Sequence, residues 1–163
     1  MNNINAQKLS LDKFQKYGRF AQIINPVTPC LGEKPVLFYR DIIQLGGVRP
    51  LSFSNTVVDP MELRVDILEY HTATGEGFMP LDGDAAICVG IATGDGEIPV
   101  DELEAFYVPK GVMVYLNAGV WHYAPYPVDK KPINSLVILP ERTYANDCVK
   151  KQISAESQLM IKI

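Results

Sequence analysis

Residues 62–71 read Glu-Leu-Arg-Val-Asp-Ile-Leu-Glu-Tyr-His, and this stretch decides the expected fold. Side chains of a β-strand point alternately to its two faces, so the apolar residues at the odd positions are expected to share a face with Glu69 and His71. Burying a carboxylate on such a face is costly unless it is paired or hydrogen-bonded. The stretch therefore predicts either a strand that leads into a polar site or a strand end that projects into solvent.

Short apolar or alternating runs continue on both sides of this stretch, separated by clusters of glycine, proline, asparagine and aspartate. That pattern is typical of short strands joined by tight turns. The expected strands lie at 36–39, 63–68, 85–92, 105–108, 112–116 and 136–139. They predict an all-β domain that closes into a sandwich or barrel, because closure removes exposed strand edges.

Two short helices are expected beside the strands. Ser10 is placed to cap a helix over 11–18, whose apolar residues are three apart and which Gly18 would end. Pro99, followed by acidic residues, predicts one or two further helical turns. No repeat or linker interrupts the chain, so one domain over residues 1–163 is expected.

The composition argues against several classes of protein. The net charge is −4 and no stretch concentrates lysine and arginine, so nucleic acid is not an expected partner. No apolar run approaches the roughly 20 residues of a membrane span, and the N-terminus lacks the features of an export or transit signal. A soluble, cytoplasmic protein is therefore expected. Cys30, Cys88 and Cys148 lie far apart and are expected to be buried thiols rather than zinc ligands or disulfides.

The two histidines of the chain fall in two motif-like segments. The first is Glu69-x-His71, followed after four residues by Glu76 and after six more by Gly83. The second is Asn-Ala-Gly-Val-Trp-His, which ends in His122. In this order they resemble the paired motifs of the cupins, with glutamate for the first histidine and without the proline of the second motif. The resemblance implies a cupin-type, jelly-roll-like β-barrel with a pocket around both histidines.

A closer resemblance covers nearly the whole chain. Its landmarks are 11–18, Tyr39-Arg-Asp41, Glu69-Tyr-His71 continuing to 77–80, 119–122 and Asn146-Asp-Cys148. They look like those of the ureidoglycolate lyase family, formerly called ureidoglycolate hydrolases. The resemblance implies a small cytoplasmic protein, usually a homodimer, that splits ureidoglycolate into glyoxylate and urea during purine catabolism and allantoin degradation. It implies no required metal cofactor.

Several positions depart from the pattern of that family. The resemblance implies arginine where this chain has Asn55 and Tyr70, glutamine at Glu76, and histidine at Asn117 and Tyr123. Arginine binds carboxylates in a two-pronged manner that asparagine and tyrosine cannot reproduce. The expected pocket is therefore less suited to an anion. The native substrate could carry less negative charge than ureidoglycolate. Lys110 and Arg40 are candidates for the missing positive charge.

Cleavage of a ureidoglycolate-like substrate needs a base that takes the hydroxyl proton and an acid that protonates the departing urea nitrogen. His71 is the candidate base and His122 the candidate acid, since imidazole changes charge near neutral pH. The alternative is that each histidine only satisfies a buried hydrogen bond. Glu76 is expected to orient a histidine, take a proton or bind a cation, unless it lies exposed in a turn.

The expected substrate-binding residues are Glu69, Tyr70, Asn55, Asn117, Trp121 and Tyr123. Glu69 follows from the phase of its strand, which it shares with His71. Tyr70 has the opposite phase on a regular strand and is assigned only through its position in the family. Trp121 is expected in the core or in the wall of the pocket, because a tryptophan usually contributes apolar area.

The sequence is compatible with three functions. The first is a carbon–nitrogen lyase of the ureidoglycolate type. The second is a metal-dependent cupin enzyme for another small polar metabolite, with Glu69, His71, Glu76 and His122 as ligands of a divalent metal. The third is a small-molecule binder without catalysis. A homodimer is expected from the resemblance, and the apolar residues 158–163 could form a strand at an exposed edge.

Overall fold

The computed structural model describes residues 2–46 and 50–163, and most of its regular structure is β-strand. One sheet has seven strands, in the order β10 (Val120–Trp121), β7 (Ala85–Ile91), β8 (Glu104–Val108), β1 (Asn2–Lys8), β14 (Leu159–Lys162) and β4 (Arg64–Val65), with β11 (Tyr126–Pro127) also paired to β7. A second sheet has five strands, in the order β2 (Gly18–Gln22), β9 (Val112–Leu116), β6 (Glu76–Pro80), β12 (Ile133–Pro140) and β3 (Leu51–Val58). A small sheet pairs β13 (Val149–Gln152) with β5 (Ile67–Tyr70).

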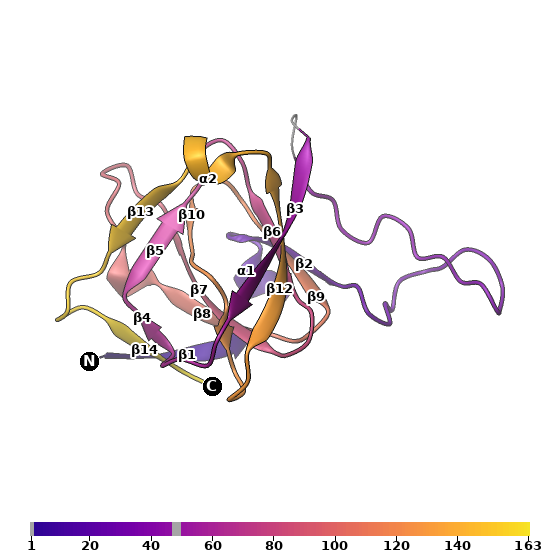
Figure 1. Ribbon diagram of the computed structural model, residues 1–163, viewed down its shortest axis with the longest axis horizontal. Helices are drawn as coiled ribbons and strands as arrows, with labels where there is room; N and C mark the ends of the chain where they lie inside the picture. The colour runs from indigo at the N-terminus through magenta and orange to yellow at the C-terminus, as the bar shows by residue number, and fades with distance from the viewer. Residues whose placement is uncertain (1, 47–49) are drawn as a thin grey trace.

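The sheets curl toward one another into a barrel-like body, from which residues 23–46 extend as an arm (Figure 1). The helices are short: α1 (Leu11–Phe14), α2 (Thr143–Asn146) and a 3-10 turn at Val100–Glu102. The all-β class and the barrel-like closure predicted from the sequence are confirmed. In the described part of the chain, no helix has the length and apolar character needed to span a membrane.

Strand β7 explains why one apolar run in the sequence is continuous rather than alternating. Its Ile87 and Val89 belong to a core cluster that lies between the two large sheets. Its Ala86 and Cys88 belong to a second cluster on the other face of the same sheet, which includes Trp121. A strand that is buried on both faces needs apolar residues at every position.

The opening stretch of the sequence is interrupted where one strand was expected. Asp66 separates β4 from β5, and Val65 and Leu68 then lie in the same core cluster. The expected shared face of the odd positions is therefore wrong across the break, because an irregular residue shifts the alternation. After the break, Leu68 is fully buried in the core while Glu69 and His71 are buried in a polar cluster.

The predicted strand at 36–39 is also wrong. These residues lie in the arm, where Val36 and Phe38 are exposed and a single bridge joins Leu31 to Phe38. These apolar side chains lie on the surface rather than in the core. Cys30 lies in the same arm and is exposed, contrary to the expectation of three buried thiols, whereas Cys88 is buried.

The N-terminal helix is shorter than predicted, and Ser10 does not cap it with its side chain. Its hydroxyl instead bonds the carboxylate of Asp12, which lowers the pKa of Asp12. The turn predicted after Pro99 is confirmed as the 3-10 turn.

The C-terminal strand is not an exposed edge. Strand β14 pairs in parallel with β1 on one side and antiparallel with β4 on the other. The prediction of a free edge is wrong because the polar N-terminal strand β1, which the sequence pattern does not reveal, takes up one of its two sides.

Candidate functional site

Four titratable side chains converge where several short strands end. Glu69 lies in β5, His71 follows that strand, Glu76 opens β6 and His122 follows β10. Glu69 and His122 form a two-way backbone bridge, with N–O distances of 2.6 and 2.8 Å. Gly75 allows β6 to begin here, since a Cβ atom at this position would lie 2.3 Å from the carbonyl oxygen of Leu116.

The two histidines face the same carboxylate oxygen. His71 Nε2 lies 3.1 Å and His122 Nε2 lies 3.4 Å from Oε2 of Glu76. The imidazole rings are 5.4 Å apart between centroids. All three residues are buried, so the alternative that Glu76 lies exposed in a turn is wrong.

The opposite nitrogen of each ring is held by the backbone. His71 Nδ1 lies 2.5 Å from the carbonyl oxygen of Asp147, and His122 Nδ1 lies 2.8 Å from that of Val120. A carbonyl oxygen only accepts hydrogen bonds, so both Nδ1 atoms carry the proton. A neutral imidazole then presents a lone pair on Nε2, which would face the lone pairs of Glu76. The arrangement therefore requires extra protons on the histidines or a cation beside Nε2.

Glu76 and His122 shift each other's pKa toward the charged forms. Burial opposes ionisation of Glu76, but the charge and hydrogen bond of His122 and those of His71 outweigh it and lower its pKa to about 2. Burial also opposes charging of His122, but Glu76 outweighs this effect and raises the pKa of His122. Glu76 and His122 therefore each favour the charged form of the other.

The donor atoms also fit a divalent metal ion. One ligand atom each from Glu69, His71 and His122 lie within 4.8 Å of one another. Metal-binding histidines commonly donate their other ring N–H to a backbone carbonyl, as both do here. Two imidazoles and a carboxylate suit ions such as Zn²⁺, Mn²⁺ or Fe²⁺. The expected metal-ligand set is thus brought together, with Glu76 bonded to both histidines.

A polar cavity of about 150 Å³ opens beside this cluster. Its walls come from six strands and helices and from the segment after β10, and they include Thr56, Glu69, Glu76, Tyr123, Val137, Tyr144 and Lys150. Among the described residues, neither histidine lines it, so a molecule in the cavity would meet Glu76 first. The volume is below the range of drug-sized ligand sites and suits a molecule of few atoms.

One wall of the cavity comes from residues 143–150, most of which the sequence analysis did not assign to the site. Lys150 Nζ lies 2.9 Å from Glu69 Oε2, and the Cys148 thiol donates to the same oxygen at 3.3 Å. Lys150 is the register partner of Glu69 in the β5–β13 pair. The family landmark at 146–148 indicated that this segment matters, but nothing in the sequence paired it with Glu69.

Two further side chains of this segment support the site. The Asp147 carboxylate accepts bonds from the backbone N–H groups of Thr72 and Ala73 at 2.7 and 2.8 Å, which holds the turn after His71. The Tyr144 ring lies 6.3 Å from the His71 ring. Burial, followed by the charges of Glu76 and Glu69, raises the pKa of Tyr144, so its hydroxyl stays protonated.

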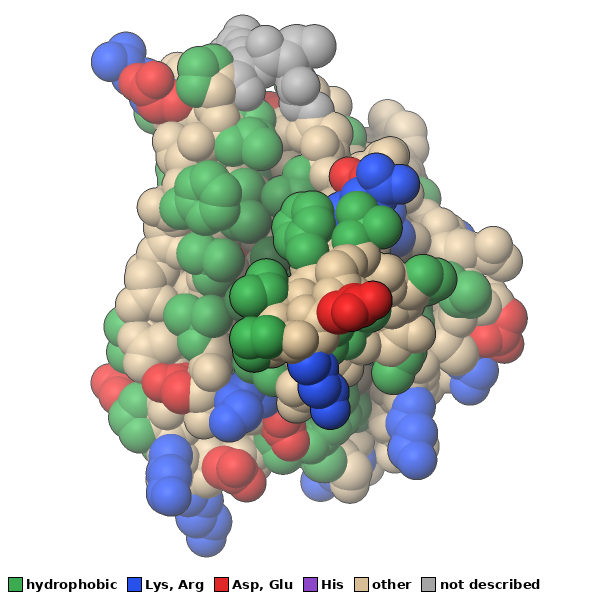
Figure 2. Space-filling model, turned by 90° about the vertical axis from the view of Figure 1, so that its right-hand side faces the viewer, with side chains coloured by type: hydrophobic (Ala, Val, Ile, Leu, Met, Phe, Trp, Pro, Cys, Tyr) green, Lys and Arg blue, Asp and Glu red, His purple; other side chains and the backbone are tan. Residues whose placement is uncertain are grey.

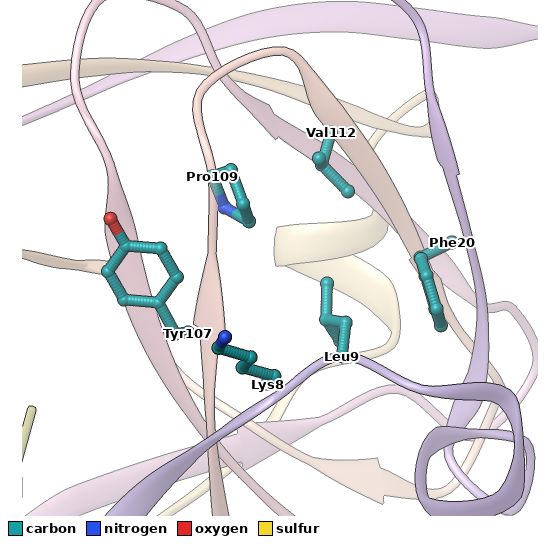
Figure 3. A pocket seen from close by; sticks show the side chains of 6 residues that line it. All are labelled: Lys8, Leu9, Phe20, Tyr107, Pro109 and Val112. Carbon is teal, nitrogen blue, oxygen red and sulfur yellow. The ribbon is translucent and has the colours of Figure 1, made fainter. Parts of the chain in front are cut away.

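A second hollow, of about 300 Å³, lies elsewhere on the barrel and is lined by Lys8, Leu9, Phe20, Tyr107, Pro109 and Val112 (Figure 3). The hydroxyl of Tyr107 is already bonded to Asp84, which together with burial raises its pKa to about 12. The remaining walls are apolar apart from the exposed Lys8. This larger space offers an apolar surface rather than an acid–base pair.

The model of the ureidoglycolate lyase family matches residues 1–161. The chain belongs to this family. The ureidoglycolate lyase of Pseudomonas savastanoi pv. phaseolicola is 30% identical over 103 residues, which are 63% of this chain and 58% of the relative. That of Pseudomonas syringae pv. syringae is 29% identical over a stretch of the same length and coverage. The match thus spans less than two thirds of the length of these relatives.

Among solved structures, an oxalate decarboxylase of Bacillus subtilis with Mn(II) centres superimposes with a TM-score of 0.45 at 19% identity. The superposition covers 64% of this chain and 24% of that protein. A mutant of the same decarboxylase gives a TM-score of 0.46 at 18% identity, with the same coverage.

This member of the ureidoglycolate lyase family places its divergent positions in different surroundings. Tyr70 packs edge-on against the buried Trp121, with ring centroids 4.5 Å apart, in the core cluster behind the site. Asn55 is exposed on β3 and bonds Asn134 at 2.9 Å. Asn117 is exposed in the turn before β10. In the described part of the chain, the polar cavity is lined by none of the predicted binding residues Tyr70, Trp121, Asn55 and Asn117.

Tyr123, like Glu76, is a divergent position that lines the cavity. The ammonium group of Lys150 lies 5.3 Å from the centre of its ring. The two other cations considered from the sequence lie elsewhere on the surface: Arg40 is beside Asp41 in the arm, and Lys110 is exposed. The positive charge of the site therefore comes from β13.

Proposed function

We propose that this chain is a ureidoglycolate lyase that cleaves the carbon–nitrogen bond of ureidoglycolate and releases glyoxylate and urea. Membership of the family suggests the reaction. The observation that carries the proposal is the buried cluster of Glu76, His71 and His122 next to a cavity of about 150 Å³. A carboxylate in contact with two imidazoles beside a small polar cavity is suited to moving protons on a small polar substrate.

The reaction breaks one carbon–nitrogen bond, forms one carbonyl bond and transfers one proton. The substrate hydroxyl loses its proton, its oxygen forms the carbonyl of glyoxylate, and the carbon–nitrogen electron pair leaves with the urea nitrogen, which gains a proton. We assign the base role to His71 and the acid role to His122, each through Nε2, because Nδ1 is held by a backbone carbonyl. Glu76 lies between them and the cavity, where it orients both rings and passes protons.

A divalent metal ion is the alternative to protons at the two Nε2 atoms, because a nitrogen atom that binds a metal ion cannot exchange a proton at the same time. Glu69, His71 and His122 would hold the ion, and it would relieve the opposition of lone pairs between the Nε2 atoms and Glu76. When bound, the ion supplies positive charge that stabilises the oxygen as the hydroxyl loses its proton. This ligand set also supports the second candidate, a metal-dependent enzyme for another small polar metabolite.

The deciding experiment measures glyoxylate and urea released from ureidoglycolate by protein purified without chelator or added metal. We expect equal amounts of the two products and enzyme-dependent turnover. Elemental analysis of the same sample, with activity before and after chelation, tests the metal. Turnover of other small ureides or hydroxy acids without any of ureidoglycolate would favour the second candidate. Saturable binding without turnover of any of them would favour a non-catalytic binder.

We further propose that the protein acts as a homodimer in the cytoplasm. The support for a dimer is apolar surface on the arm and on the adjacent edge strand β3, where Val27, Val36, Phe38, Phe53 and Val57 are 59–95% exposed. Apolar side chains gather on this face of the molecule (Figure 2). Exposed apolar patches and free strand edges favour association. Light scattering should give twice the monomer mass, and Phe53→Asp should shift the protein toward monomer.

A further inference from the structure

Lys150 combines two properties that suit it to hold a substrate anion. Of the described residues that line the polar cavity, it is the one with a permanent positive charge. Its side chain is 47% exposed, and its ammonium group touches both Glu69 and the face of the Tyr123 ring. A lysine on a long, flexible stem can change partners with little movement of the backbone.

The charge balance of the cavity points the same way. Glu69 and Glu76 bring two negative charges close to the cavity, and Lys150 offsets one of them. With a divalent ion bound by the histidines and Glu69, positive charge exceeds negative charge. A site of that balance attracts a small anion, whereas the same site without Lys150 would be neutral.

Glu69 does not depend on Lys150 alone. The Cys148 thiol donates to the same oxygen of Glu69 at 3.3 Å, and Glu69 is also one of the three residues suited to hold the metal. Glu69 therefore keeps partners if the ammonium group turns toward a ligand. The ring of Tyr123, 5.3 Å from the ammonium group, can stabilise the cation as it moves.

We propose that Lys150 is the substrate-binding residue that recognises the carboxylate of the substrate, a small 2-hydroxy acid anion, by exchanging Glu69 for it. The proposal rests on the proposed function and adds to it the residue that selects the anion. It accounts for anion binding without arginine at Asn55 or Tyr70, neither of which lines the cavity. Lys150 supplies from β13 the charge that the family pattern places elsewhere.

Lys150→Met is the test, and Lys151→Met is its matched control. Lys151 is the next residue on the same strand, so its side chain has the opposite phase, and its ammonium group bonds Glu97 at 2.5 Å outside the polar cavity. Losing one charged hydrogen bond should raise KM for ureidoglycolate about 10- to 100-fold, with kcat changed much less. Lys151→Met should leave both constants unchanged. Lys150→Arg should recover most of the affinity, because it keeps the charge.

A binding measurement separates this proposal from the proposed function. Isothermal titration of the purified protein with glycolate, and with its neutral analogue glycolamide, requires no turnover. Lys150→Met should weaken glycolate binding about 10-fold or more and leave glycolamide binding unchanged. Equal loss for both ligands, or no loss for glycolate, would overturn the role of Lys150. Absence of ureidoglycolate turnover by the unaltered protein would instead overturn the proposed function, and the titration would still decide on Lys150.

Discussion

The polar cavity and the apolar hollow differ in size and in chemistry. The hollow is the larger of the two, but the polar cavity has more charged side chains in its walls. The hollow is about 300 Å³ and the polar cavity about 150 Å³. In the hollow, Tyr107 is bonded to Asp84, Lys8 is exposed, and the other described walls are apolar. In the polar cavity, Glu69, Glu76 and Lys150 face the space. Volume alone would therefore point to the wrong place, whereas the charged walls point to the site.

The two sites also differ in the strands that surround them. Strands β1, β8 and β9 at the hollow have five to seven residues and continue the ladders of the large sheets. The polar cavity lies where the shorter strands β5, β10 and β13 end, and β10 has two residues. Where a ladder ends, backbone carbonyls become free to bond side chains, as those of Asp147 and Val120 do with the histidines. Reactive groups can then be held by the scaffold in one orientation.

The largest effect should come from removing either histidine. We expect His71→Ala and His122→Ala each to lower kcat/KM for ureidoglycolate by about 10²- to 10⁴-fold, the usual contribution of an acid–base group. Tyr107→Phe, which removes only a hydroxyl group at the hollow, should change kcat/KM less than about two-fold because that wall takes no part in the reaction. Steady-state kinetics on variants whose thermal unfolding shows an intact fold makes this comparison. Full turnover by the double histidine variant would contradict the assignment of the polar cavity as the reaction site.

A smaller effect, on stability, should come from Glu104, which opens β8, one of the strands that line the hollow. Glu104 accepts bonds from Gln7 at 3.0 Å and Tyr17 at 2.5 Å and pairs with Lys16 at 2.6 Å, which ties β8 to β1 and to the segment after α1. Its side chain is 27% exposed. We expect Glu104→Gln to lower the free energy of unfolding by about 1–2 kcal/mol at pH 7, measured by urea denaturation. The exposed Glu97→Gln should cost less, because its ion pair with Lys151 is solvated.

The same variant has a defined pH dependence. Burial opposes ionisation of Glu104, but the hydrogen bonds of Lys16, Tyr17 and Gln7 outweigh it and lower the pKa of Glu104 in the folded protein below its ordinary value of 4.5. A group with a lowered folded pKa stabilises the fold above its unfolded pKa, and this stabilisation is lost as the pH falls through the folded pKa. The stability difference between wild type and Glu104→Gln should therefore be full above pH 4.5 and shrink in stronger acid. A difference that grew on acidification would contradict this assignment.

The smallest effect should come from Ser10→Ala. A serine that caps a helix with its side chain typically contributes about 1 kcal/mol, but the Ser10 hydroxyl makes no such bond here. We expect a change in the free energy of unfolding below about 0.5 kcal/mol and no change in activity. A loss of the full capping energy in denaturant titration would show that the hydroxyl reaches the helix in solution.

The strands predicted most accurately are those with a strong local sequence pattern. Val112–Leu116 was predicted to the residue, and the run at 85–92 within one residue, because both are continuous apolar strands bounded by turn residues. Polar strands such as β1 and β13 were missed, since half or more of their side chains are polar. Their strand pairing depends on distant partners, which local composition does not reveal. The arm was misread for the opposite reason, because its apolar residues lie on the surface.

For the site, the sequence by itself determined which reactive residues exist and that Glu69, His71, Glu76 and His122 belong to paired motifs. Local spacing is sufficient for this, because the alternation of a strand places Glu69 and His71 on one face. Only the tertiary structure decided that Glu76 bonds both histidines, that Tyr70 turns into the core, and that Lys150 meets Glu69. These contacts join positions up to 81 residues apart, since Lys150 follows Glu69 by that distance in the chain. Pairing over such distances is set by the packing and register of whole sheets, on which no short stretch of sequence carries information.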